Sequence, residues 1–278
     1  MRQRRHERGA VRVDRGWVWE VADGVGFWRV ALLEQWQWPV AIRAVFSSRT
    51  GGVSEGPFSS LNLSTGVGDD PRAVAQNRRR LAAAAGFDPA ACARVQQVHG
   101  RQVCTVPGPG AWGEADALIT SVPGTVLCVR TADCVPIYVI DPRARVAGLA
   151  HAGWRGTAAD VVGALVATMA TAFGCRPADL LGAVGPAIGP CCYEVDAPVI
   201  TALEKAATWS GGVLKTTGPD HARLDLWDAN RRRLLDAGLA PDRVAVAGIC
   251  TACHPDLLFS HRRDGGRTGR MEAALWLP

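Results

Sequence analysis

The sequence predicts a mixed α/β fold, built as a single compact domain. Apolar, β-branched runs alternate with stretches whose apolar residues recur at helical spacing, which is the pattern of strands and helices that share one core. Hydrophobic residues make up 48% and charged residues 21% of the 278 residues, a balance typical of globular proteins. Because single α/β domains of this size are common, the length does not require a division.

Five runs have the composition of strands, and three stretches have the periodicity of helices. The predicted strands cover residues 42–47, 126–130, 137–140, 146–150 and 244–249. The clearest helix is capped by Asp70, carries Pro71 in its first turn and ends at Gly86. Two further helices are expected over about 157–173 and 226–237, each followed by a glycine.

The front of the chain differs in composition from the rest. Residues 1–39 form a basic, tryptophan-rich segment that we expect to pack on or precede the catalytic domain of residues 40–278. The segment holds five of the ten tryptophans, namely Trp17, Trp19, Trp28, Trp36 and Trp38. Much of the formal charge of +5 lies in its first 15 residues, and one short basic arm does not predict nucleic-acid binding.

The cysteines indicate a reducing compartment. The chain has nine, yet no apolar run follows the basic start as in a secretory signal, and no run of about 18 apolar residues predicts a membrane span. We therefore expect free thiols and a cytoplasmic location, without a membrane partner. An ordinary core role is expected for Cys92, Cys104, Cys128 and Cys175.

Three glycine- or proline-flanked segments at predicted strand ends carry metal-binding side chains. They are QQVHG with His99, TADCVP with Cys134, and HAGWRG with His151. Ligands so far apart in sequence favour a catalytic site over a structural one. Two imidazoles and a thiolate suit zinc and leave a fourth position open for water or substrate. Without a metal, Cys134 beside a histidine would instead be the nucleophile of a cysteine hydrolase.

The segment from Cys250 to His254 matches the Cys-x-x-Cys-His pattern of covalent haem attachment. Since haem attachment belongs to exported proteins and no export signal is present, we expect no haem and interpret Cys250 and Cys253 as paired buried cysteines. A zinc site on this segment would need a fourth ligand that the sequence does not identify.

Four arginines in glycine-rich or loop settings are candidates for binding phosphate, whose oxygens guanidinium groups bind in pairs. They are Arg49, Arg155, Arg263 and Arg270. Asp133, next to Cys134, is predicted with these arginines to contact the substrate, and is also expected to orient a histidine or to accept a proton. Asp116 and Glu194 are acid–base candidates by position alone.

At these residues the chain closely resembles the YfiH-like laccase-domain family, from about Phe46 to the C-terminus. The shared motifs are FSSRTGGVS, SLNLSTGVGDDP, QQVHG, ADALIT, TADCVP, HAGWRG, GPAIGPCCYEV and FSHRRDGGRTGRM. The resemblance implies α/β/β/α layers with mixed sheets, and zinc held by His99, Cys134 and His151. Neither the tryptophan-rich segment nor the Cys-x-x-Cys-His element belongs to the recognised pattern.

The resemblance also implies the substrates. They are phosphate and a purine nucleoside, either adenosine, inosine, guanosine or methylthioadenosine, and adenosine is in addition deaminated to inosine. We expect a monomer. The copper polyphenol oxidase activity also attributed to the family suits this chain less well, because six scattered histidines are few for a multicopper centre. Two other hypotheses remain, a cysteine hydrolase acting on a cell-wall precursor amide and a non-enzymatic protein that binds partners through its front segment.

Overall fold

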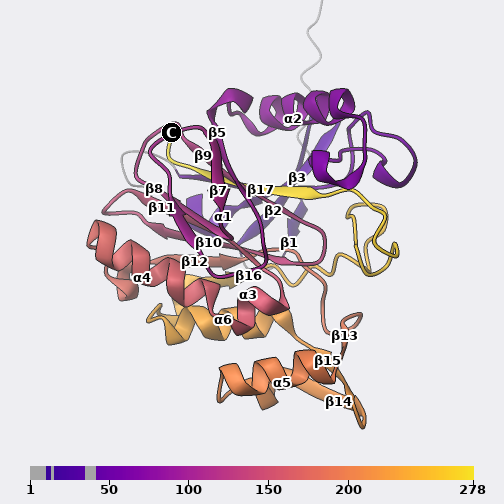
Figure 1. Ribbon diagram of the computed structural model, residues 1–278. Coiled ribbons are helices and arrows are strands. Elements are labelled where there is room, and N and C mark those ends of the chain that lie inside the picture. The colour runs from indigo at the N-terminus through magenta and orange to yellow at the C-terminus, as the bar shows by residue number, and fades with distance from the viewer. Residues whose placement is uncertain (1–10, 14–15, 35–41) are drawn as a thin grey trace, which may run out of the picture.

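Two large β-sheets pack face to face between outer helices (Figure 1). The computed structural model describes residues 11–13, 16–34 and 42–278. Helix α2 (Pro71–Ala85) covers one sheet, and helices α4 (Val161–Phe173) and α6 (Leu226–Asp236) cover the other. This arrangement confirms the expected mixed α/β fold in α/β/β/α layers.

The larger sheet joins the front of the chain to its end. Its strands, in spatial order, are β1 (Val11–Val13), β2 (Trp17–Ala22), β3 (Val25–Val30), β4 (Arg43–Ser47), β17 (Met271–Trp276), β9 (Val126–Thr131), β5 (Cys92–Gln96) and β7 (Gly110–Glu114). Pairing is antiparallel as far as β9, and β5 is parallel to both of its neighbours. Short helix α1 (Ala31–Glu34) follows β3.

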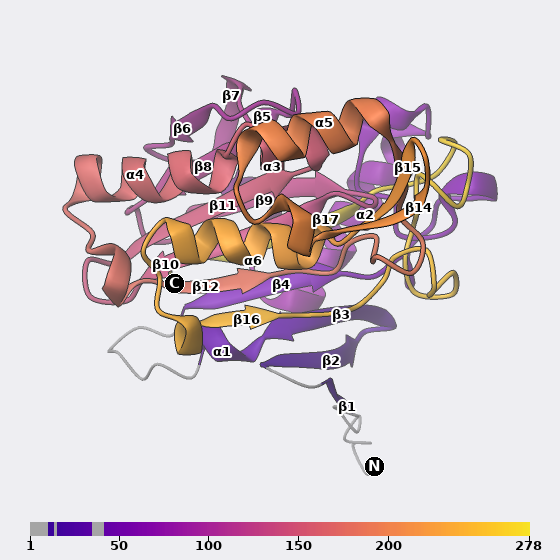
Figure 2. The ribbon, with the colours of Figure 1, turned by 90° about the horizontal axis from the view of Figure 1, so that it is seen from below.

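The second sheet supplies the most deeply buried strands. Its order is β16 (Val244–Val246), β12 (Leu181–Val184), β10 (Val135–Asp141), β11 (Val146–Ala152), β8 (Ala117–Thr120) and β6 (Val103–Thr105). Every residue of β10 and β11 is buried, because the other sheet covers one face and helices cover the other. A small sheet of β13 (Glu194–Asp196), β15 (His221–Leu224) and β14 (Leu214–Gly218) lies below, beside α5 (Ala197–Ala206) (Figures 1 and 2).

The tryptophan-rich front segment takes part in the core between the sheets. Trp17 is fully buried, and its ring meets the edge of Tyr138 at a centroid distance of 5.9 Å. The hydroxyl of Tyr138 in turn donates to the carbonyl of Val45, 2.8 Å away on the facing sheet. Strands β1 to β3 therefore extend the larger sheet at its edge. Residues 1–10, 14–15 and 35–41, which include Trp36, Trp38 and the expected boundary at 39/40, lie outside the described residues.

The predicted helices agree with the structure except at one break. Helix α2 has the expected limits, with Asp70 accepting a hydrogen bond from the amide of Arg72 and Gly86 ending it in the left-handed region. The helix expected over 157–173 is instead divided into α3 (Trp154–Ala158) and α4. Asp160 adopts a φ of 61° and its side chain caps α4, so the chain turns before the second helix begins. None of the described helices is long and apolar enough to cross a bilayer.

Candidate metal centre and active site

The three predicted ligands converge where the two sheets meet. His99 follows β5, Cys134 lies in the turn by which β9 of the larger sheet passes into β10 of the second, and His151 is the penultimate residue of β11. One ligand atom of each residue lies within 4.8 Å of the other two. The imidazole rings of His99 and His151 meet edge to face at 4.9 Å. The tertiary fold thus brings together the three residues predicted from their motifs.

Asp116, a fully buried residue just before β8, holds two of the predicted ligands in place. Its carboxylate accepts the Nδ1–H of His151 at 2.9 Å and the backbone amides of Val98, His99 and Gly100 at 3.2, 3.0 and 2.6 Å. The bond at Nδ1 directs Nε2 of His151 toward the thiol. The amide bonds hold His99 at a φ of 60°, a conformation that non-glycine residues seldom adopt. Asp116, rather than the predicted Asp133, is therefore the carboxylate that orients His151.

Charge favours a thiolate at Cys134. Burial alone would raise the pKa of this thiol, but His151 and His99 outweigh burial and lower its pKa to about 6. Burial would likewise lower the pKa of His151, yet Cys134 and Asp116 raise its pKa to about 9. The chain by itself therefore holds a thiolate next to an imidazolium. A bound metal cation can take the place of the proton on that imidazolium, because it supplies the positive charge that the thiolate needs nearby.

The donor set fits one zinc ion. Two imidazoles and one thiolate are ordinary zinc ligands at about 2.0 to 2.3 Å, and three protein ligands are the usual number at a catalytic zinc. The backbone is shaped for this convergence, since a Cβ on Gly153 would lie 2.9 Å from Sγ of Cys134.

A cavity of about 250 Å³ opens onto His99 and Cys134, two of the three predicted ligands. Besides His99 and Cys134, its wall includes five side chains that can bind or donate a proton to a ligand. These are Asp133, Arg155, Tyr193, His261 and Arg262. A second, outer cavity of about 560 Å³ shares Trp154, Arg155, Tyr193 and Arg262 with the first. We refer to these two adjacent cavities together as the recess; His99 and Cys134 line its inner cavity only.

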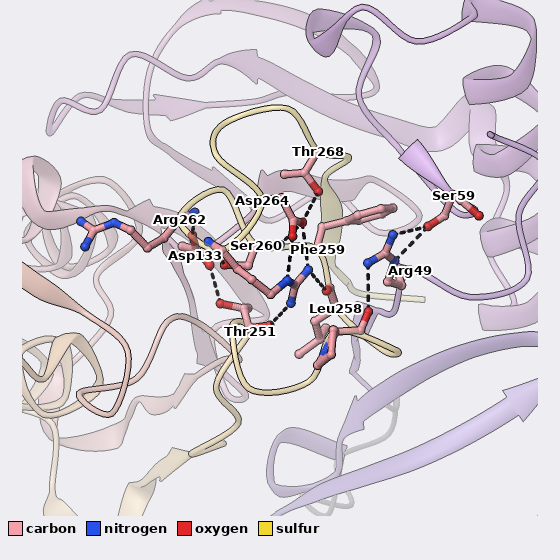
Figure 3. A network of polar contacts seen from close by, with 12 residues as sticks. Arg49, Ser59, Asp133, Thr251, Leu258, Phe259, Ser260, Arg262, Asp264 and Thr268 are labelled. Atoms are coloured by element: carbon pink, nitrogen blue, oxygen red, sulfur yellow. Dashed lines mark hydrogen bonds and ion pairs between the residues drawn. The ribbon is translucent and has the colours of Figure 1, made fainter. Parts of the chain in front are cut away.

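Asp133 shapes the wall of this recess. Its carboxylate accepts the hydroxyl of Thr251 at 2.5 Å and the backbone amide of Arg262 at 2.7 Å (Figure 3). Its carbonyl accepts the amide of Ile188 at 3.0 Å, and its φ is 87°. With both carboxylate oxygens engaged, Asp133 joins the turn that carries Cys134 to two segments from the last third of the chain.

The four predicted arginines occupy different positions. Arg155 lines both cavities, and its guanidinium lies 4.3 Å from the ring centre of Trp154. Arg49, Arg263 and Arg270 lie outside the lining and donate to backbone carbonyls, as Figure 3 shows for Arg49 and Ser59. Burial lowers the pKa of Arg270, while Cys134 and Asp133 act in the opposite direction, so this residue lies within electrostatic reach of the site.

Sequence reasoning missed three residues of the wall, Tyr193, His261 and Arg262. Tyr193 is buried, and Arg262 extends over its ring at 5.0 Å from the ring centre. Burial, aided by Cys134, raises the pKa of the Tyr193 hydroxyl and keeps it protonated. These residues stand in the GPCCYEV and FSHRRDGG motifs, so their motifs were the available signal. Glu194, predicted as an acid–base candidate, lines only the outer cavity.

Over most of its length the chain is similar in sequence to proteins named purine nucleoside phosphorylase. The chain is 43% identical over 246 residues to the purine nucleoside phosphorylase YlmD of Geobacillus stearothermophilus, covering 83% of this chain and 88% of that protein. It is 46% identical over 239 residues to a purine nucleoside phosphorylase of Deinococcus radiodurans, covering 86% and 90%.

Two solved structures have the same fold as this chain. The YfiH protein of Bacillus licheniformis superposes with a TM-score of 0.87 at 33% identity, covering 92% of this chain and 97% of that one. YlmD of Geobacillus stearothermophilus superposes with a TM-score of 0.85 at 39% identity, covering 96% and 98%. A family model described as "Multi-copper polyphenol oxidoreductase laccase" matches residues 43–278. The chain therefore belongs to the laccase-domain family of YfiH and YlmD, whose named relatives include purine nucleoside phosphorylases.

Proposed function

We propose that this protein is a zinc-dependent purine nucleoside phosphorylase. It would cleave the N-glycosidic bond of adenosine, inosine, guanosine or methylthioadenosine with phosphate, and release the free base and ribose 1-phosphate or its methylthio analogue. The observation that carries the proposal is one recess that combines a His–Cys–His metal centre with two arginines, in a chain whose relatives bear this name. A reducing cytoplasm, expected from the cysteines, would keep Cys134 available to the metal.

Arg155 and Arg262 are suited to hold the phosphate. Both are exposed at the recess, and both guanidinium groups lie against aromatic rings that restrict their positions. Arg262 is further fixed by a bond to the carbonyl of Glu194. Paired guanidinium groups bind phosphate oxygens at defined angles and keep the nucleophile facing the sugar. The predicted phosphate role of Arg49, Arg263 and Arg270 stays a prediction, with Arg270 within electrostatic reach of Cys134 and Asp133.

His99, Cys134 and His151 would hold the zinc at the inner end, where it supplies a Lewis acid with an open coordination position. The leaving purine needs a proton at its ring nitrogen, and the recess offers Tyr193 and His261 as donors. Tyr193 is protonated at neutral pH and is held beside Arg262. The same recess would serve deamination of adenosine, in which water adds at C6 of the purine and ammonia leaves.

Product analysis tests the proposal directly. Zinc-loaded protein incubated with adenosine and phosphate should form adenine and ribose 1-phosphate, and inosine where water replaces the amino group. Arg155→Gln should raise the KM for phosphate by roughly 10- to 100-fold, the equivalent of one hydrogen bond to a charged group. Arg176→Gln, at an exposed arginine remote from the recess, is the matched control. Absence of turnover by the metal-loaded protein would contradict the assignment.

A cysteine hydrolase is the second candidate, favoured by the thiolate and imidazolium that the metal-free residues form. The two candidates differ in how they respond to chelation. A hydrolase would retain activity without metal and would form an acyl adduct on Cys134 that mass spectrometry detects. A phosphorylase would lose activity on chelation and carry no adduct. Copper in place of zinc, found by elemental analysis together with oxidation of a phenol, would instead support the polyphenol oxidase.

A further inference from the structure

Four cysteines that the active site does not use meet at one point of the surface. Cys191 and Cys192 lie in the connection between β12 and β13, and Cys250 and Cys253 lie after β16. The four Sγ atoms all lie within 4.8 Å of one another. Cys250 is buried, whereas Cys191 and Cys253 are exposed, so the expectation of two buried cysteines here was wrong for Cys253. The ligands that the Cys-x-x-Cys pair lacked in sequence thus come from an earlier segment of the chain.

The separations match a single tetrahedral ion. Thiolates at about 2.3 Å from zinc stand about 3.8 Å apart along the edges of a tetrahedron. Sγ of Cys253 lies 3.5 Å from Sγ of Cys191 and 3.4 Å from Sγ of Cys192. Neither of these two distances is that of a disulfide bond, in which the sulfur atoms lie about 2.05 Å apart. A cluster of several iron and sulfide atoms would not fit between sulfurs this close together.

The backbone holds the four cysteines together independently of any metal. Ala187 and Cys250 form a parallel β-bridge, and the amide of Thr251 donates to the carbonyl of Ala187 at 3.0 Å. The amide of Gly189 donates to Sγ of Cys250 at 3.3 Å. Such N–H to sulfur bonds stabilise a ligating thiolate. The ligand positions are therefore formed in advance, and binding would not have to order the chain.

The surrounding charge suits an anionic four-thiolate centre. One Zn²⁺ with four thiolates carries a net charge of −2. The guanidinium of Arg223 donates to the carbonyl of Cys191 at 2.8 Å, which places a positive charge beside the cluster. His254 bonds through Nδ1 to the carbonyl of Cys250 at 2.8 Å, so its ring lies next to the four cysteines.

We propose that Cys191, Cys192, Cys250 and Cys253 bind a second, structural zinc ion. Four protein ligands leave no open position, in contrast to the three ligands of the catalytic centre. The ion would clamp the segment before Tyr193 to the segment of Thr251. Tyr193 lines the active-site recess and Thr251 bonds to Asp133, so the clamp would stabilise the outer wall of that recess.

Metal counting on paired variants tests the proposal. Full-length protein purified under reducing conditions with zinc should contain two zinc ions per chain. Cys253→Ser and Cys134→Ser should each contain one, from different sites, and Cys104→Ser, at a half-exposed cysteine outside both clusters, should contain two. X-ray absorption of the Cys134→Ser protein should show the remaining zinc with four sulfur neighbours at about 2.3 Å. One zinc in the wild type that Cys253→Ser leaves unchanged would overturn the proposal.

A measurement on the unmodified chain guards against a variant that fails to fold. Cys191 and Cys253 are exposed, so iodoacetamide should modify them quickly in metal-free protein and slowly in zinc-loaded protein. Equal rates in both states would refute the site. Iron in place of zinc, or a mass showing an oxidised cysteine pair in freshly reduced protein, would also refute it. Because thiol protection is read without substrate, the result is independent of the phosphorylase assignment.

Discussion

Replacing Asp116 by Asn tests how the proposed metal centre is assembled. Asn retains the size of Asp116 but removes its charge and turns one acceptor oxygen into a donor. One oxygen of the carboxylate accepts His99 and His151, and the other accepts Val98 and Gly100. Whichever way the amide is placed, its NH₂ group faces two hydrogen-bond donors. At least two bonds to a buried charge are therefore lost.

The expected cost follows from these contacts. A hydrogen bond to a charged group contributes about 1.5 to 3 kcal/mol, so two lost bonds lower the free energy of unfolding by about 3 kcal/mol or more. Loss of the partner that orients a metal-binding histidine typically weakens metal binding by about 10- to 100-fold. Both effects should appear together in Asp116→Asn, because the same carboxylate positions His99 and His151.

Zinc affinity is measured by competition with a chromophoric chelator, and stability by urea unfolding of the metal-free protein. Asp141→Asn is the matched control. Asp141 is also buried, and it lies at the opposite end of β10 from Cys134. One oxygen of its carboxylate accepts the backbone amides of both Arg143 and Ala144. An amide can keep both of those bonds, so stability and zinc affinity should change little. Wild-type zinc affinity in Asp116→Asn would refute the assigned orienting role.

Three further outcomes are expected. Gly153→Ala should weaken zinc binding about tenfold, because the added Cβ would lie 2.9 Å from Sγ of Cys134. Gly108→Ala is the control for this variant. It should bind zinc normally in the same competition assay, since Gly108 has open space around it. Glu272→Gln should lower the free energy of unfolding by about 3 kcal/mol in urea, since it leaves Arg94 without its charged partner, and zinc affinity should not change. Chelation should lower the thermal midpoint of the wild type, and an unchanged midpoint would show that the folded state does not bind metal under those conditions.

Local signals predicted local structure well. The Asp70 cap, the helical spacing and Gly86 placed α2 at its observed limits, because capping and periodicity act over a few neighbouring residues. The same helical spacing of apolar residues continues across Asp160 and predicted one helix over 157–173. In the structure Asp160 is left-handed, and this single residue divides the predicted helix into α3 and α4. A helix-compatible pattern of apolar residues contains no information about such a turn.

The motifs identified the kinds of ligand, and the fold decided which groups support them. His99, Cys134 and His151 were recognisable because metal-binding side chains stood beside glycine and proline at strand ends. Asp133 was the expected orienting carboxylate because it is adjacent to Cys134, yet Asp116 has that role. The difference arises in space, since the approach of β8 to the loop after β5 brings Asp116 under both histidines.

By itself the sequence determined the fold class and the family, and it predicted three residues that could hold a metal ion, because each depends on short motifs or on periodicity. Only the tertiary structure decided that Asp116 orients the ligands, that Tyr193 and Arg262 face them, and that Cys191 and Cys192 join Cys250 and Cys253. The physical reason is that these contacts join segments far apart in the chain. Their meeting depends on how two sheets pack and cross, which no stretch of neighbouring residues specifies.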